Sequence, residues 1–153
     1  MKTQNLFNST VDEVSIVYHN SVRPSERQKV TNSQSAHEIL RNIWDDQIEL
    51  YESFYILFLN RANRVLGYRC ISQGGVSGTV VDPKAIFQAA LLANASSIIL
   101  AHNHPSGNTT PSEADEKITR KIKSAGEFLE IQVIDHLILG EDSFCSFADD
   151  GRM

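Results

Sequence analysis

The chain of 153 residues is long enough for one domain with one hydrophobic core, and too short for two ordinary domains. Hydrophobic residues make up 41% and charged residues 22%, which is the balance of a globular protein and argues against global disorder. The formal net charge of -5 argues against a dedicated nucleic-acid binder, because such proteins carry a basic balance or a basic stripe.

The sequence also indicates a compartment. Two cysteines, Cys70 and Cys145, are too few for a disulfide framework and lack CxxC spacing. The N-terminal MKTQNLFNST has no apolar segment of the signal-peptide kind, and no apolar run approaches the ~18 residues of a membrane span. We therefore expect a reduced, cytoplasmic compartment and no contact with a membrane.

Apolar periodicity and turn residues predict the elements of the chain. In chain order they are a strand at 13–19, a helix at 35–45, strands at 52–60 and 64–71, a helix at 83–94, a strand at 97–101, a helix at 113–128, and strands at 131–139 and 143–148. Alternating strands and helices of this order predict an α/β fold with a mixed β-sheet flanked by helices, in two or three layers. We divide the chain into an N-terminal strand and loop extension, 1–34, and one domain, 35–153.

Local signals refine these elements. Ser35 is expected to cap the first helix and Asp82 the second, with Pro83 at its first position. Gly126 is expected to weaken the end of the third helix. The Gly- and Ser-rich segment 72–79 is not followed directly by a helix, so it predicts a bulge or a substrate-facing loop rather than a phosphate site.

Two histidines at the end of a predicted buried strand form the strongest chemical signal. His102 and His104 are two residues apart, and residues i and i+2 of an extended chain point to the same side. Asp115 follows in the first turn of a predicted helix. Two imidazoles and one carboxylate leave a fourth tetrahedral position for water, as in catalytic zinc sites. Taken alone, the same residues also suit a structural histidine pair and a Ser112–Asp115 capping box.

The string HNHPSGNTTPSEAD, residues 102–115, resembles the JAMM or MPN-plus metalloprotease motif, His-x-His-Pro followed by Ser-x-x-Asp. The particular residues of this string are similar to the corresponding segment of the RadC family. Comparable flanking segments extend the resemblance over about residues 40–150: ESFYILFLNRANRVLG, the SGT at 77–79, DPKAIFQAALLANASSIILA and IQVIDHLILG. The resemblance implies the JAMM/MPN fold, which is cytidine-deaminase-like in architecture, although the HxE and PCxxC of a zinc deaminase do not occur.

The resemblance also implies roles for individual residues. His102, His104 and Asp115 match the ligands of one Zn²⁺ per chain. Ser112 matches the motif serine, which is expected to hydrogen-bond the oxyanion or the metal water. Glu52, at the start of a predicted strand, matches the general base, with Glu49 as the alternative.

Asp135 and His136 follow in a predicted strand. Asp135 is expected to orient a metal-binding histidine and His136 to line the site, unless both are satisfied residues at a sheet edge.

The resemblance predicts a zinc-dependent metallopeptidase or isopeptidase with a peptide, protein or isopeptide substrate. Two alternatives stay open. One is a DNA-repair-associated accessory protein with nucleic acid as partner, for which the basic residues Lys117, Arg120, Lys121 and Lys123 give weak support. The other is a non-catalytic interaction module. The helix-hairpin-helix region expected in longer RadC-like proteins has no counterpart in residues 1–34.

Overall fold

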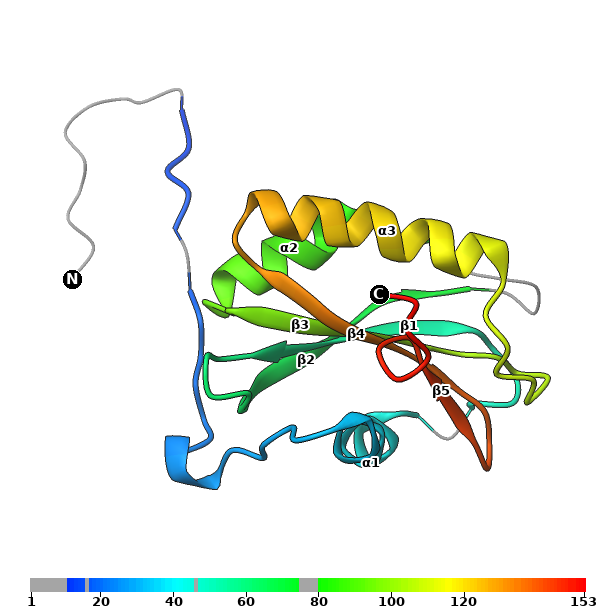
Figure 1. Ribbon diagram of the computed structural model, residues 1–153. Helices are drawn as coiled ribbons and strands as arrows, with labels where there is room; N and C mark the ends of the chain where they lie inside the picture. Colours follow the sequence, from blue (N-terminus) through cyan, green and yellow to red (C-terminus); the bar gives the residue numbers. More distant parts are fainter. Residues whose placement is uncertain (1–10, 16, 46, 75–79) are drawn as a thin grey trace, which may run out of the picture.

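The computed structural model describes residues 11–15, 17–45, 47–74 and 80–153, which form three layers with helices on both faces of a sheet (Figure 1). The elements are η1 (Pro24–Glu26), α1 (Ser33–Ile43), β1 (Ser53–Leu59), β2 (Val65–Gln73), α2 (Pro83–Leu92), β3 (Ser97–Asn103), α3 (Glu113–Phe128), β4 (Gln132–Leu139) and β5 (Phe144–Ser146). The described strands form one mixed sheet in the order β2-β1-β3-β4-β5, with β3 and β4 parallel and the other neighbours antiparallel. The predicted α/β class is confirmed.

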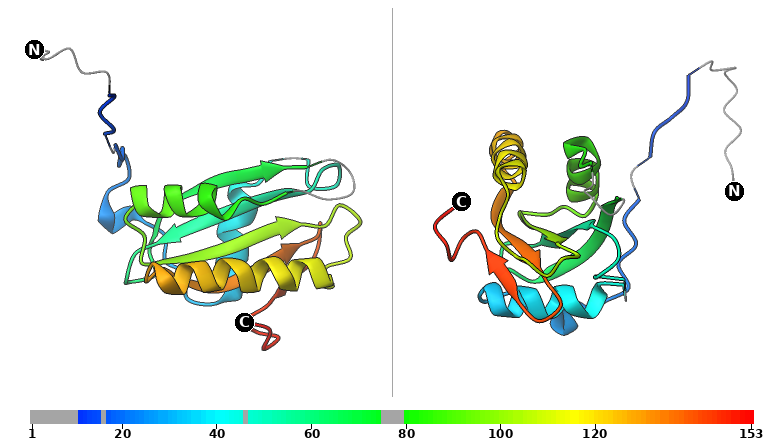
Figure 2. Two further views of the ribbon diagram at one scale, coloured as in Figure 1. Left: turned by 90° about the horizontal axis from the view of Figure 1, so that it is seen from above. Right: turned by 90° about the vertical axis from the view of Figure 1, so that its right-hand side faces the viewer.

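Each face of the sheet has its own hydrophobic core. α1 covers one face, and α2 and α3 lie side by side over the other (Figure 2). Leu57 of β1 packs in the core under α1, whereas Ile56 packs in the core under α2 and α3. Because successive side chains of a strand point to opposite faces, β1 is buried along its whole length, which explains its continuous apolar sequence.

The first helix begins earlier than predicted. Its N-cap is Asn32, whose side-chain oxygen accepts from the amide of Ser35 at 2.8 Å, while the Ser35 hydroxyl oxygen accepts from the amide of Asn32 at 3.1 Å. Ser35 is therefore the reciprocal member of a capping box rather than the cap itself. The Asp82 cap of α2 is confirmed, since its carboxylate accepts from the Lys84 amide at 2.9 Å.

Two other predictions about the strands are wrong. Residues 13–15 and 17–19 form no strand, because alternation alone supplies no ladder partner; the Tyr18 hydroxyl instead donates to the carbonyl of Leu66 at 2.8 Å. The strand predicted to end at residue 101 continues to Asn103, because residues 102 and 103 pair in register with β4. None of the described helices is both long enough and apolar enough to cross a membrane.

Gly126 is required by packing near the end of α3. Its carbonyl accepts from the amide of Ile131 at 2.8 Å, as the chain turns from α3 into β4. A Cβ at residue 126 would collide with the carbonyl oxygen of Ile131. Glycine has a low helix propensity, but at this position it allows the backbone of α3 to approach the backbone of Ile131 closely.

Candidate metal centre

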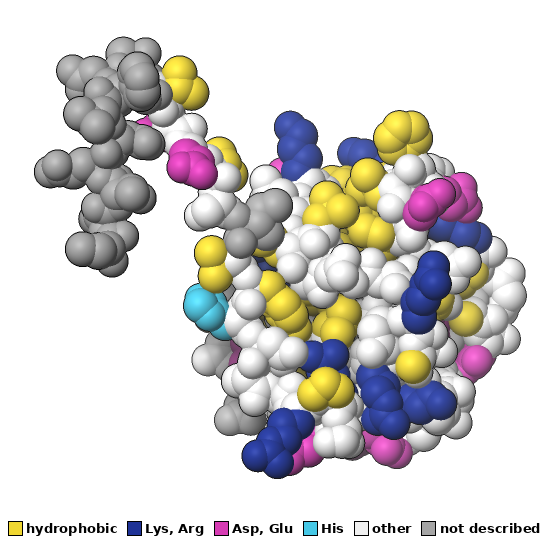
Figure 3. Space-filling view, turned by 90° about the vertical axis from the view of Figure 1, so that its left-hand side faces the viewer, with side chains coloured by type: hydrophobic (Ala, Val, Ile, Leu, Met, Phe, Trp, Pro, Cys, Tyr) yellow, Lys and Arg dark blue, Asp and Glu magenta, His cyan; other side chains and the backbone are white. Residues whose placement is uncertain are grey.

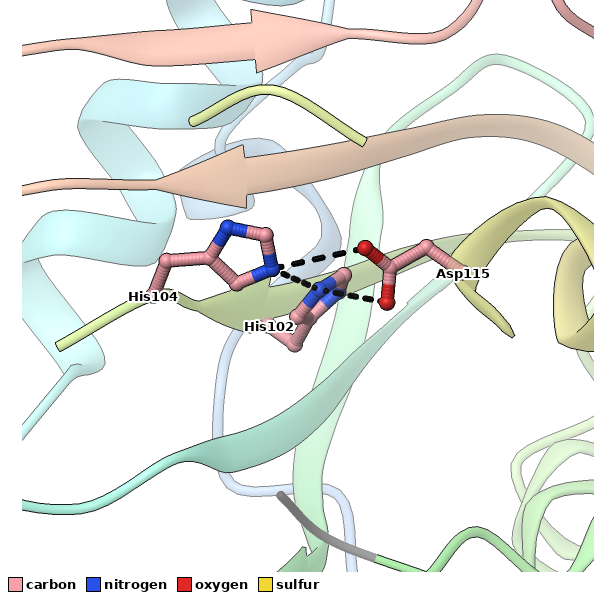
Figure 4. A group of neighbouring side chains, drawn as sticks. All are labelled: His102, His104 and Asp115. Atoms are coloured by element: carbon pink, nitrogen blue, oxygen red, sulfur yellow. Dashed lines mark hydrogen bonds and ion pairs between the residues drawn. The ribbon is translucent and has the colours of Figure 1, made fainter. Parts of the chain in front are cut away.

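The three predicted metal ligands converge at one end of the sheet (Figure 4). His102 belongs to β3, His104 follows its last residue, and Asp115 lies in the first turn of α3. The Nε2 atom of His102 lies 3.1 Å from Nε2 of His104 and 3.2 Å from Oδ1 of Asp115. The Nε2 atom of His104 lies 3.4 Å from Oδ2 of Asp115. Strand alternation and the first turn of α3 thus bring three ligand atoms to one point.

These separations fit one zinc ion. Bonds of about 2.0–2.2 Å at tetrahedral angles place neighbouring ligand atoms about 3.3 Å apart, close to the 3.1 Å between the two Nε2 atoms and to the 3.2 Å and 3.4 Å from each Nε2 to one or the other Asp115 oxygen. Within the described part of the chain, this is the one group of at least three His, Cys, Asp or Glu side chains able to hold a metal in this way. Two imidazoles with one carboxylate are also a donor set that suits zinc.

The electrostatics of the group favour an anionic carboxylate. Burial alone would raise the pKa of Asp115, but hydrogen bonds from His102 and His104 outweigh it and hold that pKa far below its usual range. The hydrogen bond to Asp115 in turn raises the pKa of His104, against the opposing effect of burial. Asp115 is therefore ionised as a metal ligand must be, and a cation that binds here displaces a proton shared with the histidines.

The capping box and the metal site are built from the same residues. Ser112 is the N-cap of α3, and its hydroxyl oxygen accepts from the amide of Asp115 at 3.1 Å. The Oδ2 atom of Asp115 accepts from the amide of Ser112 at 2.8 Å. The structural interpretation of Ser112-x-x-Asp115 is thus correct, and it supports metal binding because the box fixes the orientation of the carboxylate.

Behind the ligands lies a buried layer of polar side chains. The Nδ1 atom of His102 lies 2.8 Å from Nε2 of His136, and Nδ1 of His136 lies 2.6 Å from the hydroxyl of Thr119. Burial lowers the pKa of His136 well below its usual value, so its imidazole is neutral. The Nδ1 atom of His104 lies 2.6 Å from the carbonyl oxygen of Asn108. Both ligand histidines therefore have a hydrogen-bond partner on the nitrogen that faces away from the site.

The expectation that Asp135 orients a metal-binding histidine is wrong. Asp135 and His136 are neighbours in β4, so their side chains point to opposite faces of the sheet. His136 faces His102, whereas the carboxylate of Asp135 accepts from the Ser146 hydroxyl at 2.7 Å and from the Ala148 amide at 3.0 Å. Asp135 anchors the C-terminal segment, and the contact to His102 that we expected of Asp135 is made by His136.

Sequence reasoning missed Asn103, the middle residue of HNH. Its side-chain oxygen accepts from the amide of Ser53 at 2.8 Å, and its nitrogen donates to the carbonyls of Ile48 at 2.6 Å and Tyr51 at 2.8 Å. The side chain is fully buried and holds the chain on both sides of Glu52. Strand alternation was the available signal, because it turns Asn103 away from the two histidines and into the protein.

A cleft of about 420 Å³ opens beside the ligands. The predicted site residues that line it are Glu52, His102, His104, Ser112 and Asp115. Glu52 is partly buried and precedes β1, and its charge contributes to the raised pKa of His104. The alternative base Glu49 is exposed and lies beside Glu141, whose pKa it raises, and it is not among the residues lining the cleft. The SGT segment at 77–79 lies outside the described residues.

A larger concavity of about 980 Å³ lies at the other end of the sheet, around Arg61, Leu91 and Glu130. Figure 3 views the molecule from this end and shows hydrophobic side chains among Lys, Arg, Asp and Glu of both signs. The metal-binding group lies at the opposite end, so volume alone does not locate the chemistry.

Comparison with known proteins agrees with this geometry. A family model described as "RadC-like JAB domain" matches residues 30–152. A "UPF0758 protein" of Flavobacterium johnsoniae is 44% identical over 124 residues, which cover 81% of this chain and 53% of that protein. A "UPF0758 protein" of Geotalea uraniireducens is 45% identical over 102 residues, 67% of this chain and 45% of that protein. The "UPF0758 protein YfjY" of Escherichia coli strain K12 is 44% identical over 102 residues, 67% of this chain and 64% of that protein.

The chain spans about half the length of the curated relatives it matches, and the printed names of these relatives state no activity. The match nevertheless extends over most of the chain and includes β3, the HNHP segment, α3 and β4. The fold, the ligand geometry and the relatives agree that this chain belongs to the RadC-like JAB domain family.

Proposed function

We propose that this domain is a zinc-dependent hydrolase that cleaves an amide or isopeptide bond. One observation carries the proposal: three ligand atoms with the spacing of a tetrahedral zinc site line a cleft that also contains a carboxylate and a hydroxyl. Hydrolysis of an amide needs an activated water, a group that takes its proton and a donor to the carbonyl oxygen. The cleft holds side chains suited to each need.

Each side chain would have a separate task. A zinc ion on His102, His104 and Asp115 would supply an acidified water and polarise the scissile carbonyl. The carboxylate of Glu52 would take a proton from the attacking water and pass it to the leaving amine. The Ser112 oxygen already accepts from the Asp115 amide, so its own proton would be donated to the carbonyl oxygen as negative charge develops there.

The substrate class that we propose is a peptide, a protein or an isopeptide. A DNA-repair accessory role has less support, because the basic residues of α3 share their surface with acids. Glu116 pairs with Arg120 at 3.8 Å and with Arg152 at 2.6 Å, so this surface has mixed charge. We also propose a cytoplasmic location, which suits the free thiols of Cys70 and Cys145.

The test is hydrolysis of a panel of fluorogenic peptide amides and isopeptide-linked conjugates by the zinc-loaded protein. Glu52→Gln is expected to lower kcat by about 10²- to 10⁴-fold while zinc content is unchanged. Glu49→Gln is the matched control, because Glu49 is exposed outside the cleft, and it should keep the activity of the wild type. Full activity of Glu52→Gln, or no hydrolysis of any substrate by the zinc-loaded wild type, would refute the proposal.

A further inference from the structure

Two buried side chains, His136 and Thr119, connect one candidate metal ligand, His102, to another, Asp115, behind the candidate zinc site. His102 contacts His136, His136 contacts Thr119, and the Thr119 hydroxyl donates to the backbone carbonyl of Asp115 at 2.6 Å. The exposed fractions of the three side chains are 1%, 0% and 2% for His102, His136 and Thr119, so water does not compete for these contacts. The chain of contacts therefore begins at one ligand and ends at the backbone of another.

The donor and acceptor of each hydrogen bond can be deduced by starting from the last contact, between Thr119 and the carbonyl of Asp115. The oxygens of Thr119 and Asp115 lie 2.6 Å apart, and a separation of that size needs a hydrogen between them. A carbonyl has no hydrogen, so the single hydroxyl proton of Thr119 lies on this contact. The Thr119 oxygen must then accept from Nδ1–H of His136. The reverse alignment would leave two oxygen lone pairs facing each other at 2.6 Å.

The remaining protons are then determined. His136 is fully buried, and its ring contacts the Thr119 hydroxyl and the His102 ring rather than a carboxylate, so it carries a single ring proton. With that proton on Nδ1, its Nε2 can only accept, and Nδ1 of His102 donates to it across 2.8 Å. In the metal-binding form, which has lost the proton shared with Asp115, His102 keeps only its Nδ1 proton, so its Nε2 presents a lone pair beside Nε2 of His104 and Oδ1 of Asp115. We propose that Thr119 and His136 are positioning residues that hold His102 in the one tautomer able to bind a metal ion.

The packing around His136 supports a fixed ring. Its ring centroid lies 4.8 Å from that of Phe147 and 5.5 Å from that of Phe54. Phe54 also stacks on His102 with an interplanar angle of 3°. Both imidazoles are therefore held by aromatic contacts as well as by hydrogen bonds, which limits ring flips that would break the chain.

This inference rests on the proposed zinc site but not on the proposed hydrolysis, so it is tested by metal affinity. Zinc affinity is measured by competition with a chromogenic chelator for Thr119→Val, which has the same shape without the hydroxyl, and for Thr119→Ser, which keeps the hydroxyl. We expect Thr119→Val to bind zinc about 10- to 100-fold more weakly and Thr119→Ser to stay within a few-fold of wild type. Equal affinity of Thr119→Val and wild type, or equal losses in the two variants, would overturn the inference.

Long-range ¹H–¹⁵N NMR of the zinc-loaded wild type gives a second readout that needs no variant. The nitrogen shifts should show a proton on Nδ1 of both His102 and His136. A proton on Nε2 of His136 would overturn the inference even if zinc binds. A wild type that binds no zinc would refute the zinc site itself, whereas tight zinc binding without hydrolysis would refute only the proposed activity.

Discussion

Replacing Asn103 with leucine should destabilise the protein more than any exposed substitution in the cleft. Leucine has nearly the shape of asparagine, so no large cavity forms, but three hydrogen bonds are lost. The Ser53 amide and the Ile48 carbonyl would stay buried without partners, at about 1–3 kcal/mol each, whereas the carbonyl of the exposed Tyr51 can turn to water. We therefore expect a loss of about 4 kcal/mol, a large share of the roughly 5–15 kcal/mol that stabilises a domain.

The assay is urea denaturation of the metal-free protein in a chelating buffer, with hydrogen exchange at the Ser53 amide as a local readout. Asn60→Ala is the matched control, since the partly buried Asn60 side chain accepts from the amides of Ala62 at 2.9 Å and Arg64 at 3.0 Å at the far end of β1. It should cost about 1 kcal/mol or less and leave the Ser53 amide protected. A loss under about 1 kcal/mol for Asn103→Leu, with unchanged exchange at Ser53, would refute the reasoning.

Three further predictions follow from the packing, the helix caps and a partly buried histidine. Gly126→Ala should lower the free energy of unfolding by about 1–3 kcal/mol in spite of the better helix propensity of alanine, because the new Cβ meets the Ile131 carbonyl; a gain in stability would contradict this contact. Ser112→Ala should cost about 1 kcal/mol in chemical denaturation through loss of the N-cap, and Ser112→Asn, which keeps a capping oxygen, should recover most of it. Burial lowers the pKa of His37 in the folded protein, so the free energy of unfolding should fall as the pH drops below about 6.5. In metal-free protein, His37→Leu should make the free energy of unfolding depend less on pH in this range, and an unchanged pH dependence would contradict the prediction.

Much of the fold could be predicted from local patterns. The ends of β1, α2 and α3 came close to their predicted positions, because long apolar runs and caps such as Asp82 act locally. The predictions that failed depended on which strands lie side by side, which local sequence does not reveal. Residues 13–15 and 17–19 alternate as a strand does but form no ladder with a neighbouring strand, and residues 102–103 extend β3 because they pair with β4.

In the candidate site, too, some features follow from local sequence and others depend on strand pairing. The ligand residues were predicted because strand alternation and motif spacing place His102, His104 and Asp115 without further information, and the structure brings them together. The supporting groups were not predictable in the same way. The partner of His102 depends on the register of β4 against β3, which decides that His136 and not Asp135 faces the site.

The central claim is that the three converging side chains bind zinc. Elemental mass spectrometry of the dialysed protein tests it most directly, with wild type beside His104→Ala and beside His19→Ala, which changes an exposed histidine at a distant position in the sequence. We predict about one zinc per chain in wild type and His19→Ala, and loss of zinc in His104→Ala. No zinc in the wild type, even after zinc is supplied, would contradict the account.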